Sequence, residues 1–242
     1  MAWKNQLNQW FCDILDWLYP PVCGGCNQPG SRWCSICRAN IIPLPEPICE
    51  ACGAPQKWDG VCLKCQVEPP HYRGLRSWVV YEGSIRNVLL GLKYRRNICL
   101  GKVLAVPLST FALSLKWPVE MIVPVPLGKK RKQERGYNQV ELIAHPLAIL
   151  TGWQYEPKIL KRTRETRSQV GLNNTERHEN MHDAFRAEPF LASGRKVLLV
   201  DDITTTGATL ESCTEALLSA GARAVYALTL ARALPHHGWN IV

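Results

Sequence analysis

The segment Lys196–Thr209, which reads KVLLVDDITTTGAT, carries most of the information about the fold. Its apolar part, Val197–Val200, is typical of a buried strand in a parallel sheet. Two adjacent acids, Asp201 and Asp202, end this strand, and a threonine-rich loop that contains Gly207 follows them. Ligands of parallel α/β proteins bind at the carboxyl ends of the strands, so we expect a ligand site beside the two acids.

The residues after this loop complete a strand–loop–helix–strand unit. The pattern predicts a helix over 209–220, ended by Gly221, and a second strand over 224–230. The N-terminus of such a helix is an anion site, because its backbone N–H groups lack partners. Backbone N–H groups and threonine hydroxyls suit a terminal phosphate, and the two carboxylates suit ribose hydroxyls. The chain contains neither G-x4-G-K-[ST] nor G-x-G-x-x-G, which would indicate a P-loop or a Rossmann site.

Eight of the eleven cysteines form four C-x2-C pairs. Two such pairs supply the four thiolates of a tetrahedral zinc site, so the pattern predicts two structural zinc ions. Pairing the first knuckle with the second and the third with the fourth is the simpler arrangement, and a cross-braced arrangement stays open. A disulfide framework is disfavoured because the chain has no export signal. The expected zinc ligands are Cys23, Cys26, Cys34, Cys37, Cys49, Cys52, Cys62 and Cys65.

Charge is distributed unevenly along the chain. Residues 1–70 contain five Lys/Arg and six Asp/Glu, whereas residues 71–242 contain 24 Lys/Arg and 14 Asp/Glu. The basic C-terminal part is expected to bind a phosphorylated ligand or a nucleic acid, with much of its charge on a solvated surface. Eight thiolates around two zinc ions make the N-terminal part more acidic still, which opposes docking on a phosphate backbone. We therefore expect the zinc ions to be structural and to replace a hydrophobic core.

The composition is that of a globular protein, with 46% apolar and 20% charged residues. No apolar run approaches the roughly 18 residues that a membrane helix needs, and the first twenty residues do not form a signal peptide. We therefore expect a cytoplasmic protein with no membrane span. Residues 1–20 have a helical apolar pattern that predicts an amphipathic helix docked on the rest of the protein. Its tryptophans leave a partner or a membrane surface as the alternative.

Four features together resemble one family. Val200–Thr209 resembles the motif with which type I phosphoribosyltransferases bind phosphoribosyl diphosphate (PRPP). With Val123–Pro126 followed by Arg135–Gln139, with Arg162–Thr166 and with the cysteine pairs, the chain resembles the ComF/GntX family, associated with DNA uptake in competent bacteria and with use of external DNA. The resemblance implies an α/β fold, a type I phosphoribosyltransferase-like parallel sheet with flanking helices, preceded by a small zinc-ribbon module. The expected parts are the helix over 1–20, a double zinc-ribbon module over 21–70 and a phosphoribosyltransferase-like domain over 71–242.

Two helices of the last part have predictable ends. Ser84 is expected to cap a helix that ends in the cations after Leu92, where positive charge favours the helix dipole. A second helix, after Gln139, is expected to kink or restart near His145, because Pro146 lies inside it.

The resemblance also implies roles for individual residues. The loop after the motif strand would hold the 5′-phosphate and the acids would face the ribose, which gives the PRPP-binding set Asp201, Asp202, Thr204, Thr205, Thr206, Gly207, Ala208 and Thr209. A basic loop, a helix start and a mobile lid would face the diphosphate, which gives the set Lys129, Lys130, Arg131, Arg135, Asn138, Gln139, Arg162 and Arg164. Only one or two cations of the basic loop are expected to touch the ligand, and helix capping explains Asn138 equally well. Mg²⁺ is expected to arrive with PRPP, since no dedicated ligand set is visible.

Three functions fit these features. The first is a phosphoribosyltransferase linked to DNA uptake or nucleotide metabolism, for which the sequence gives no acceptor-recognising pattern. The second is a non-catalytic nucleotide sensor or single-stranded-DNA-handling protein on the same fold. The third is a scaffold that joins DNA-import proteins through the zinc module. The expected partners are PRPP or a related sugar phosphate, with single-stranded DNA or DNA-import proteins as alternatives.

Overall fold

The computed structural model describes residues 20–163 and 184–234 of the 242-residue chain. The amphipathic helix expected over 1–20 falls on residues 1–19 and lies outside this part. Up to residue 70 the described chain contains two short helices, α2 (Ser35–Ala39) and α3 (Leu63–Val67), which begin directly after the zinc-ligand candidates Cys34 and Cys62. Within the described ranges, no helix is long and apolar enough to span a membrane.

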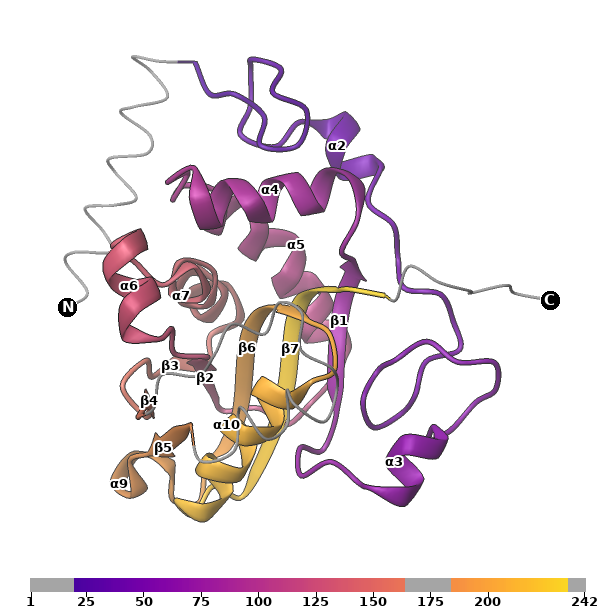
Figure 1. The fold of residues 1–242 in the computed structure, drawn as a ribbon, viewed down its shortest axis with the longest axis vertical. Coiled ribbons are helices and arrows are strands. Elements are labelled where there is room, and N and C mark those ends of the chain that lie inside the picture. Colours follow the sequence, from indigo (N-terminus) through magenta and orange to yellow (C-terminus); the bar gives the residue numbers. More distant parts are fainter. Residues whose placement is uncertain (1–19, 164–183, 235–242) are drawn as a thin grey trace.

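A sheet of five strands that pair in parallel forms the centre of the molecule (Figure 1), with the order β1–β7–β6–β2–β3. The strands are β1 (Leu75–Val80), β2 (Met121–Pro124), β3 (Gln154–Tyr155), β6 (Lys196–Thr204) and β7 (Ala224–Arg232). A separate antiparallel pair consists of β4 (Leu160–Arg162) and β5 (Phe185–Ala187). The expected parallel α/β fold is confirmed.

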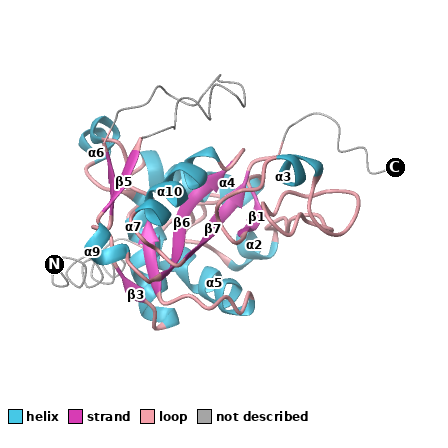
Figure 2. Cartoon of the chain, turned by 90° about the horizontal axis from the view of Figure 1, so that it is seen from below, coloured by secondary structure: helices cyan, strands magenta, loops and turns pink. Residues whose placement is uncertain are grey.

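Helices cover both faces of this sheet, and Figure 2 shows α5 and α10 on opposite sides of the strands. One face packs against α4 (Gly83–Tyr94), α5 (Leu100–Ser114) and α7 (Gln139–Thr151), and the other against α10 (Ala208–Ser219) and the short α9 (Pro189–Ala192). Side chains of β6 alternate between the two cores: Val197 and Leu199 face α10, and Leu198 and Val200 face the other three helices. A strand buried on both faces has this period of two and reads as a continuous apolar run.

The segment quoted above folds largely as predicted, with a longer strand. β6 includes both acids and continues to Thr204, because β7 pairs with it as far as Thr204 opposite Arg232. The loop before α10 is therefore short. It ends at Gly207, whose φ of 86° lies in the left-handed region that favours glycine.

Two expectations about neighbouring helices were wrong. Ser84 does not cap α4, and its hydroxyl instead donates to the carbonyl of Cys37 at 2.6 Å. The basic segment after β2 is not a loop but a helix, α6 (Lys129–Arg135), which Gly136 ends at a φ of 82°. The helix turns the basic side chains in several directions, so they do not all reach one site.

The expected interruption of α7 is also absent, because the helix runs through Pro146 to Thr151. Proline cannot donate to the carbonyl four residues earlier, which belongs to Leu142. That carbonyl lies against Gly101 of α5, where an added Cβ would approach the oxygen to 2.4 Å. The close approach of α5 covers the carbonyl group that Pro146 leaves without its usual partner.

Candidate functional site

The first four candidate zinc ligands come together beside α4. Their sulfur atoms lie within 4.8 Å of one another, and the sulfurs of Cys26 and Cys34 are 3.8 Å apart. Four thiolates at a Zn–S distance of about 2.3 Å form a tetrahedron with edges of about 3.8 Å, so this spacing fits zinc. Burial favours the neutral thiol of Cys23, but N–H groups of Cys34, Cys26 and Gly25 outweigh it and lower the pKa of Cys23 to about 6. The group consists of Cys23, Cys26, Cys34 and Cys37.

The second four cysteines form an equivalent group beside β1. Their sulfurs also lie within 4.8 Å of one another, and those of Cys52 and Cys62 are 3.9 Å apart. The backbone N–H groups of Cys62 and Cys52 donate to the sulfur of Cys49 at 3.3 and 3.5 Å. They outweigh the opposing effect of burial and lower the pKa of Cys49 to about 7. The group consists of Cys49, Cys52, Cys62 and Cys65, so the pairing of knuckles is sequential in both sites.

The first zinc site is fixed to α4, below α2 in Figure 1. The hydroxyl of Ser84 donates to Cys37, and the side chain of Asn87 donates to the carbonyl of Gly25 at 3.0 Å. Gly25 leaves no space between these parts, since an added Cβ would lie 2.7 Å from the sulfur of Cys37. The zinc site therefore holds the N-terminal half of α4, and the last turn of the same helix reaches the acids of β6.

The second zinc site is fixed to the β1–β7 edge of the sheet. The N–H of Leu75 donates to the carbonyl of Ala51 at 2.8 Å, and an added Cβ on Gly53 would lie 2.3 Å from the carbonyl oxygen of Leu75. Arg232, at the end of β7, is 5% exposed. Its guanidinium donates to the carbonyl of the zinc-ligand candidate Cys52 and, at 3.5 Å, to the carbonyl of Thr205 in the loop before α10. A buried cation thus joins the zinc site to that loop.

At the carboxyl end of the sheet, the side chain of Asp202 connects β6 with α4 and α7. Oδ2 of Asp202, which is 4% exposed, accepts from Nε2 of Gln139 at 2.9 Å and lies 3.0 Å from Nζ of Lys93. Oδ1 of Asp201 accepts from the N–H of Asp202 at 2.8 Å. Lys93 belongs to the last turns of α4 and Gln139 begins α7. The carboxylate of Asp202 is therefore ion-paired before any ligand arrives.

Asp201 has a different electrostatic environment. Burial raises the pKa of Asp201 to about 8, and the negative charge of Asp202 shifts it in the same direction. Lys93 and Arg162 oppose the shift. Since Asp201 still borders a cavity, an entering ligand meets a carboxyl group that exchanges its proton near neutral pH.

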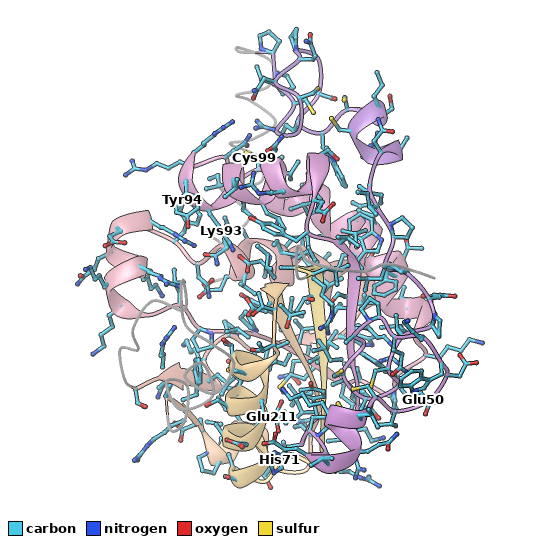
Figure 3. The ribbon with its side chains drawn as sticks, turned by 45° about the vertical axis from the view of Figure 1, so that its right-hand side comes forward. Glu50, His71, Lys93, Tyr94, Cys99 and Glu211 are labelled. Atoms are coloured by element: carbon cyan, nitrogen blue, oxygen red, sulfur yellow. The ribbon has the colours of Figure 1, made fainter. Side chains whose placement is uncertain are left out.

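A cavity of about 530 Å³ opens above the acids. Asp201 and Asp202 lie on one side, and Thr209 borders it at the first turn of α10. Figure 3 shows Lys93 and Tyr94 at the end of α4, on the side of the molecule where α6 lies. The cations that line the cavity are Lys93, Arg96, Arg131, Arg135 and Arg162. A cavity with three acidic residues (Glu134, Asp201 and Asp202) and five cations suits a ligand that carries both hydroxyl and phosphate groups.

The expected PRPP-binding residues do not all border this cavity. Thr205, Thr206 and Gly207 line a second cavity, of about 1090 Å³, on the side of the loop that faces the second zinc site. Thr204 and Ala208 are buried, and Oγ1 of Thr204 has no hydrogen-bond partner within the described residues. The loop therefore separates two cavities.

The structure divides the expected diphosphate set in a similar way. Seven of its eight members are described: five line the cavity, and Lys129 and Lys130 are on α6 but do not line it. Arg135 donates to Oε1 of Gln139 at 2.7 Å and its guanidinium stacks 4.9 Å from the centre of the Tyr94 ring. Arg164 lies outside the described residues. Those that line the cavity are Arg131, Arg135, Asn138, Gln139 and Arg162.

Asn138 caps α7, because its Oδ1 accepts from the N–H of Val140 at 3.0 Å. Sequence reasoning missed Lys93, Tyr94, Arg96 and Tyr137, which also line the cavity. Lys93, Tyr94 and Arg96 follow the apolar part of the helix predicted after Ser84. No local pattern shows that the end of this helix meets a strand more than a hundred residues later.

Comparison with known protein families identifies the same two parts of the chain, the zinc module and the α/β part. Residues 14–66 match the double zinc ribbon domain family, and residues 158–237 match the phosphoribosyl transferase domain family. The chain is therefore a protein of the phosphoribosyltransferase fold that carries an N-terminal double zinc ribbon.

Full-length relatives narrow this class. The chain is 31% identical over 226 residues to the DNA utilization protein YhgH of Salmonella typhimurium, which covers 89% of this chain and 98% of the relative. It is 29% identical over 222 residues to the competence protein ComFC of Bacillus subtilis, with 85% and 86% covered. A glutamine phosphoribosylpyrophosphate amidotransferase from B. subtilis superposes with a TM-score of 0.35 and 22% identity over 57% of this chain and 26% of its own, too loosely to add weight. The chain belongs to the ComF family.

Proposed function

We propose that the 530 Å³ cavity binds PRPP together with Mg²⁺ and that the protein transfers its phosphoribosyl group to a base-like acceptor. One observation carries this proposal: the Asp201–Asp202 pair lies at the end of a parallel strand, beside a helix N-terminus, in a cavity that five cations also line. Phosphate groups bind helix N-termini and arginine, and ribose hydroxyls donate to carboxylates. PRPP carries all of these groups in one molecule.

The residues divide the ligand among them. Thr209, in the first turn of α10, would hold the 5′-phosphate, and the two acids would accept hydrogen bonds from the ribose hydroxyls. Arg131, Arg135 and Arg162 would face the diphosphate. Mg²⁺ suits this site as a companion of the diphosphate, because hard cations prefer carboxylate and phosphate oxygens and keep several waters.

The reaction would be a displacement at the anomeric carbon. A bond forms between an acceptor nitrogen and that carbon while the bond from the carbon to the diphosphate oxygen breaks. The leaving oxygen keeps the electron pair, and the acceptor nitrogen gives up its proton. Fixed cations around the diphosphate would stabilise the charge that develops on it. The Lys93–Asp202 pair would keep one carboxylate in place during this step.

Release of diphosphate from Mg²⁺-bound PRPP, measured with a panel of purine, pyrimidine and pyridine acceptors, tests the proposal. Acceptor-dependent release should fall by about a hundredfold or more in Asp201→Asn/Asp202→Asn, since charged groups aimed at the reacting centre contribute this much. Asp59→Asn is the matched control, because Asp59 is exposed in the zinc module. If no acceptor supports release by folded, zinc-loaded protein, the transferase proposal is wrong.

We place this activity in DNA utilization or uptake, because the relatives are named for those processes. The two four-cysteine zinc sites support a cytoplasmic location, because their ligands must stay reduced.

The second candidate is a non-catalytic nucleotide sensor or a protein that handles single-stranded DNA together with DNA-import proteins. The excess of Lys/Arg over Asp/Glu in residues 71–242 favours it. Binding of a single strand by the full chain should then weaken steeply with salt. Lys130→Gln/Lys132→Gln, two exposed positions on α6 away from the cavity, should reduce both the affinity and the salt dependence. DNA binding that is indifferent to salt would contradict this candidate.

A further inference from the structure

A second group of metal-ligating side chains lies on the far side of the loop before α10. His71 comes from the segment between α3 and β1, and Glu211 and Glu215 come from α10. Residues four apart on a helix share a face, so the two glutamates point the same way. Figure 3 shows His71 and Glu211 turned toward each other. One donor atom from each of the three residues lies within 4.8 Å of the others.

Glu211 is the buried member of this group. Its side chain is 12% exposed, and Oε1 accepts both from the backbone N–H of His71 at 2.8 Å and from Nδ1 of the same residue at 2.5 Å. Oε2 is buried and has no hydrogen-bond partner in the described part of the chain. A buried carboxylate oxygen without a donor is costly. The His71–Glu211 hydrogen bonds account for Oε1 and leave Oε2 unexplained.

Glu215 adds a second negative charge to the same point. Its Oε1 lies 3.6 Å from Nδ1 of His71. Neither glutamate pairs with a lysine or arginine among the described residues. The cavity of about 1090 Å³ that these residues line also contains Glu68 and three cysteines of the second zinc site. The lining also contains Lys64 and Arg232, but neither pairs with Glu211 or Glu215 among the described residues, so His71 is the partner of both carboxylates.

We propose that His71, Glu211 and Glu215 bind a third zinc ion, distinct from the two four-cysteine sites. An imidazole nitrogen with two carboxylates is a ligand set that zinc accepts, and three protein ligands leave the fourth position open. The ion takes the place of the proton between Nδ1 of His71 and Oε1 of Glu211; that proton moves to Nε2 of a neutral ring, or to solvent from a protonated one, so that a neutral imidazole binds the metal. The cavity that Glu211, Glu215 and His71 line also includes Thr206 and Gly207. This site does not depend on PRPP binding.

Calorimetric titration of zinc into the full-length protein that already holds two zinc ions tests the proposal. We expect one further saturable equivalent. Glu215→Gln should weaken it by at least about tenfold and leave the two cysteine sites filled, because Glu215 takes no part in the His71–Glu211 hydrogen bonds. Glu68→Gln, which changes a glutamate of the same cavity outside the group, should leave the third equivalent unchanged.

A second variant, Glu215→Lys, keeps the proposal testable if Glu215→Gln does not fold. In Glu215→Lys, the new ammonium group supplies the missing positive charge, so the protein should fold, hold two zinc ions and bind no third. Absence of a third equivalent in the wild type overturns the proposal. So does a third equivalent that Glu215→Gln and Glu215→Lys both retain, since the ion would then lie elsewhere.

Discussion

At the scale of single residues, the site is organised around two carboxyl groups with opposite surroundings. Both border the cavity, but Asp202 is ion-paired with Lys93, whereas burial and the neighbouring charge of Asp202 raise the pKa of Asp201. Because its pKa is raised to about 8, Asp201 is protonated at neutral pH. It can lose this proton when a ligand enters together with a bound cation. The strength of the Lys93–Asp202 ion pair and the raised pKa of Asp201 can be measured separately.

Lys93→Met should lower the free energy of unfolding by about 3 kcal/mol, because removing one partner of a buried ion pair leaves an uncompensated charge. Adding Asp202→Asn should restore most of the loss, since the remaining amide needs no counter-ion. Urea unfolding of the wild type, both single variants and the double variant gives the interaction energy. Additive effects of the two substitutions would show that the pair contributes nothing.

The free energy of unfolding should also depend on pH through Asp201. Its pKa is about 8 in the folded chain and about 4 in an unfolded one, so between these values the folded state holds the extra proton. The contribution is therefore complete below about pH 4 and is lost as the pH rises through 8. The wild type should lose at most about 1.4 kcal/mol per pH unit relative to Asp201→Asn. Parallel pH curves for the two proteins would contradict the raised pKa.

At the scale of elements, close approaches of backbone fix the helices and the zinc module on the sheet. Gly101 lets α5 reach the carbonyl of Leu142 in α7, and Gly53 lets the second zinc site reach β1. Arg232 then connects that zinc site with the loop before α10. The position of the loop thus depends on contacts that are remote in sequence.

Gly101→Ala should destabilise the protein by about 2 kcal/mol, because the new Cβ would lie 2.4 Å from the carbonyl oxygen of Leu142 and the helices must separate. Gly91→Ala in α4 is the control, since the nearest atom to its new Cβ, on the side chain of Leu100, is 3.4 Å away. That variant should be neutral or slightly stabilising through helix propensity. Thermal unfolding checks both, and equal effects would show that the close approach is unimportant.

Arg232→Met should weaken Mg²⁺–PRPP binding by about tenfold and lower stability, because the carbonyls of Cys52 and Thr205 lose their shared donor. Arg223→Met, at an exposed position before β7, is the control. Calorimetry with PRPP reports the effect on the loop, and a zinc assay reports the effect on the zinc site. Unchanged affinity in a destabilised variant would mean that Arg232 supports the fold alone.

The elements themselves were largely predictable from local patterns. The apolar run before Asp201 predicted β6, the threonine-rich loop predicted a helix over 209–220 close to the observed α10, and the C-x2-C pairs predicted both zinc sites. Errors arose where a distant partner decides the outcome. Ser84 bonds to the zinc module in place of its own helix, and α7 continues through Pro146 because α5 covers the affected carbonyl.

At the scale of the whole molecule, the zinc module and the sheet form a connected structure. The first zinc site holds α4, whose Lys93 reaches Asp202, and the second holds the β1–β7 edge, whose Arg232 reaches the loop. No sequence pattern predicted these two connections, because the partners of Lys93 and Arg232 are distant in the sequence and come near only in the folded chain. We propose that residues 21–70 and 71–234 unfold together.

Removal of zinc by a chelator should therefore lower the unfolding temperature of the entire chain in one transition and weaken PRPP binding. Circular dichroism of the α/β part and a zinc-release assay, recorded during the same heating, should show coincident midpoints. An α/β transition that stays at its original temperature after zinc removal would show two independent parts.

The central claim is that the cavity above Asp201 and Asp202 binds PRPP, and calorimetric titration of PRPP with Mg²⁺ tests it most directly. The wild type should bind with micromolar affinity, on the order of −8 kcal/mol, and Asp201→Asn/Asp202→Asn should not bind. The absence of heat from folded, zinc-loaded wild type, or equal binding by the double variant, would contradict the account.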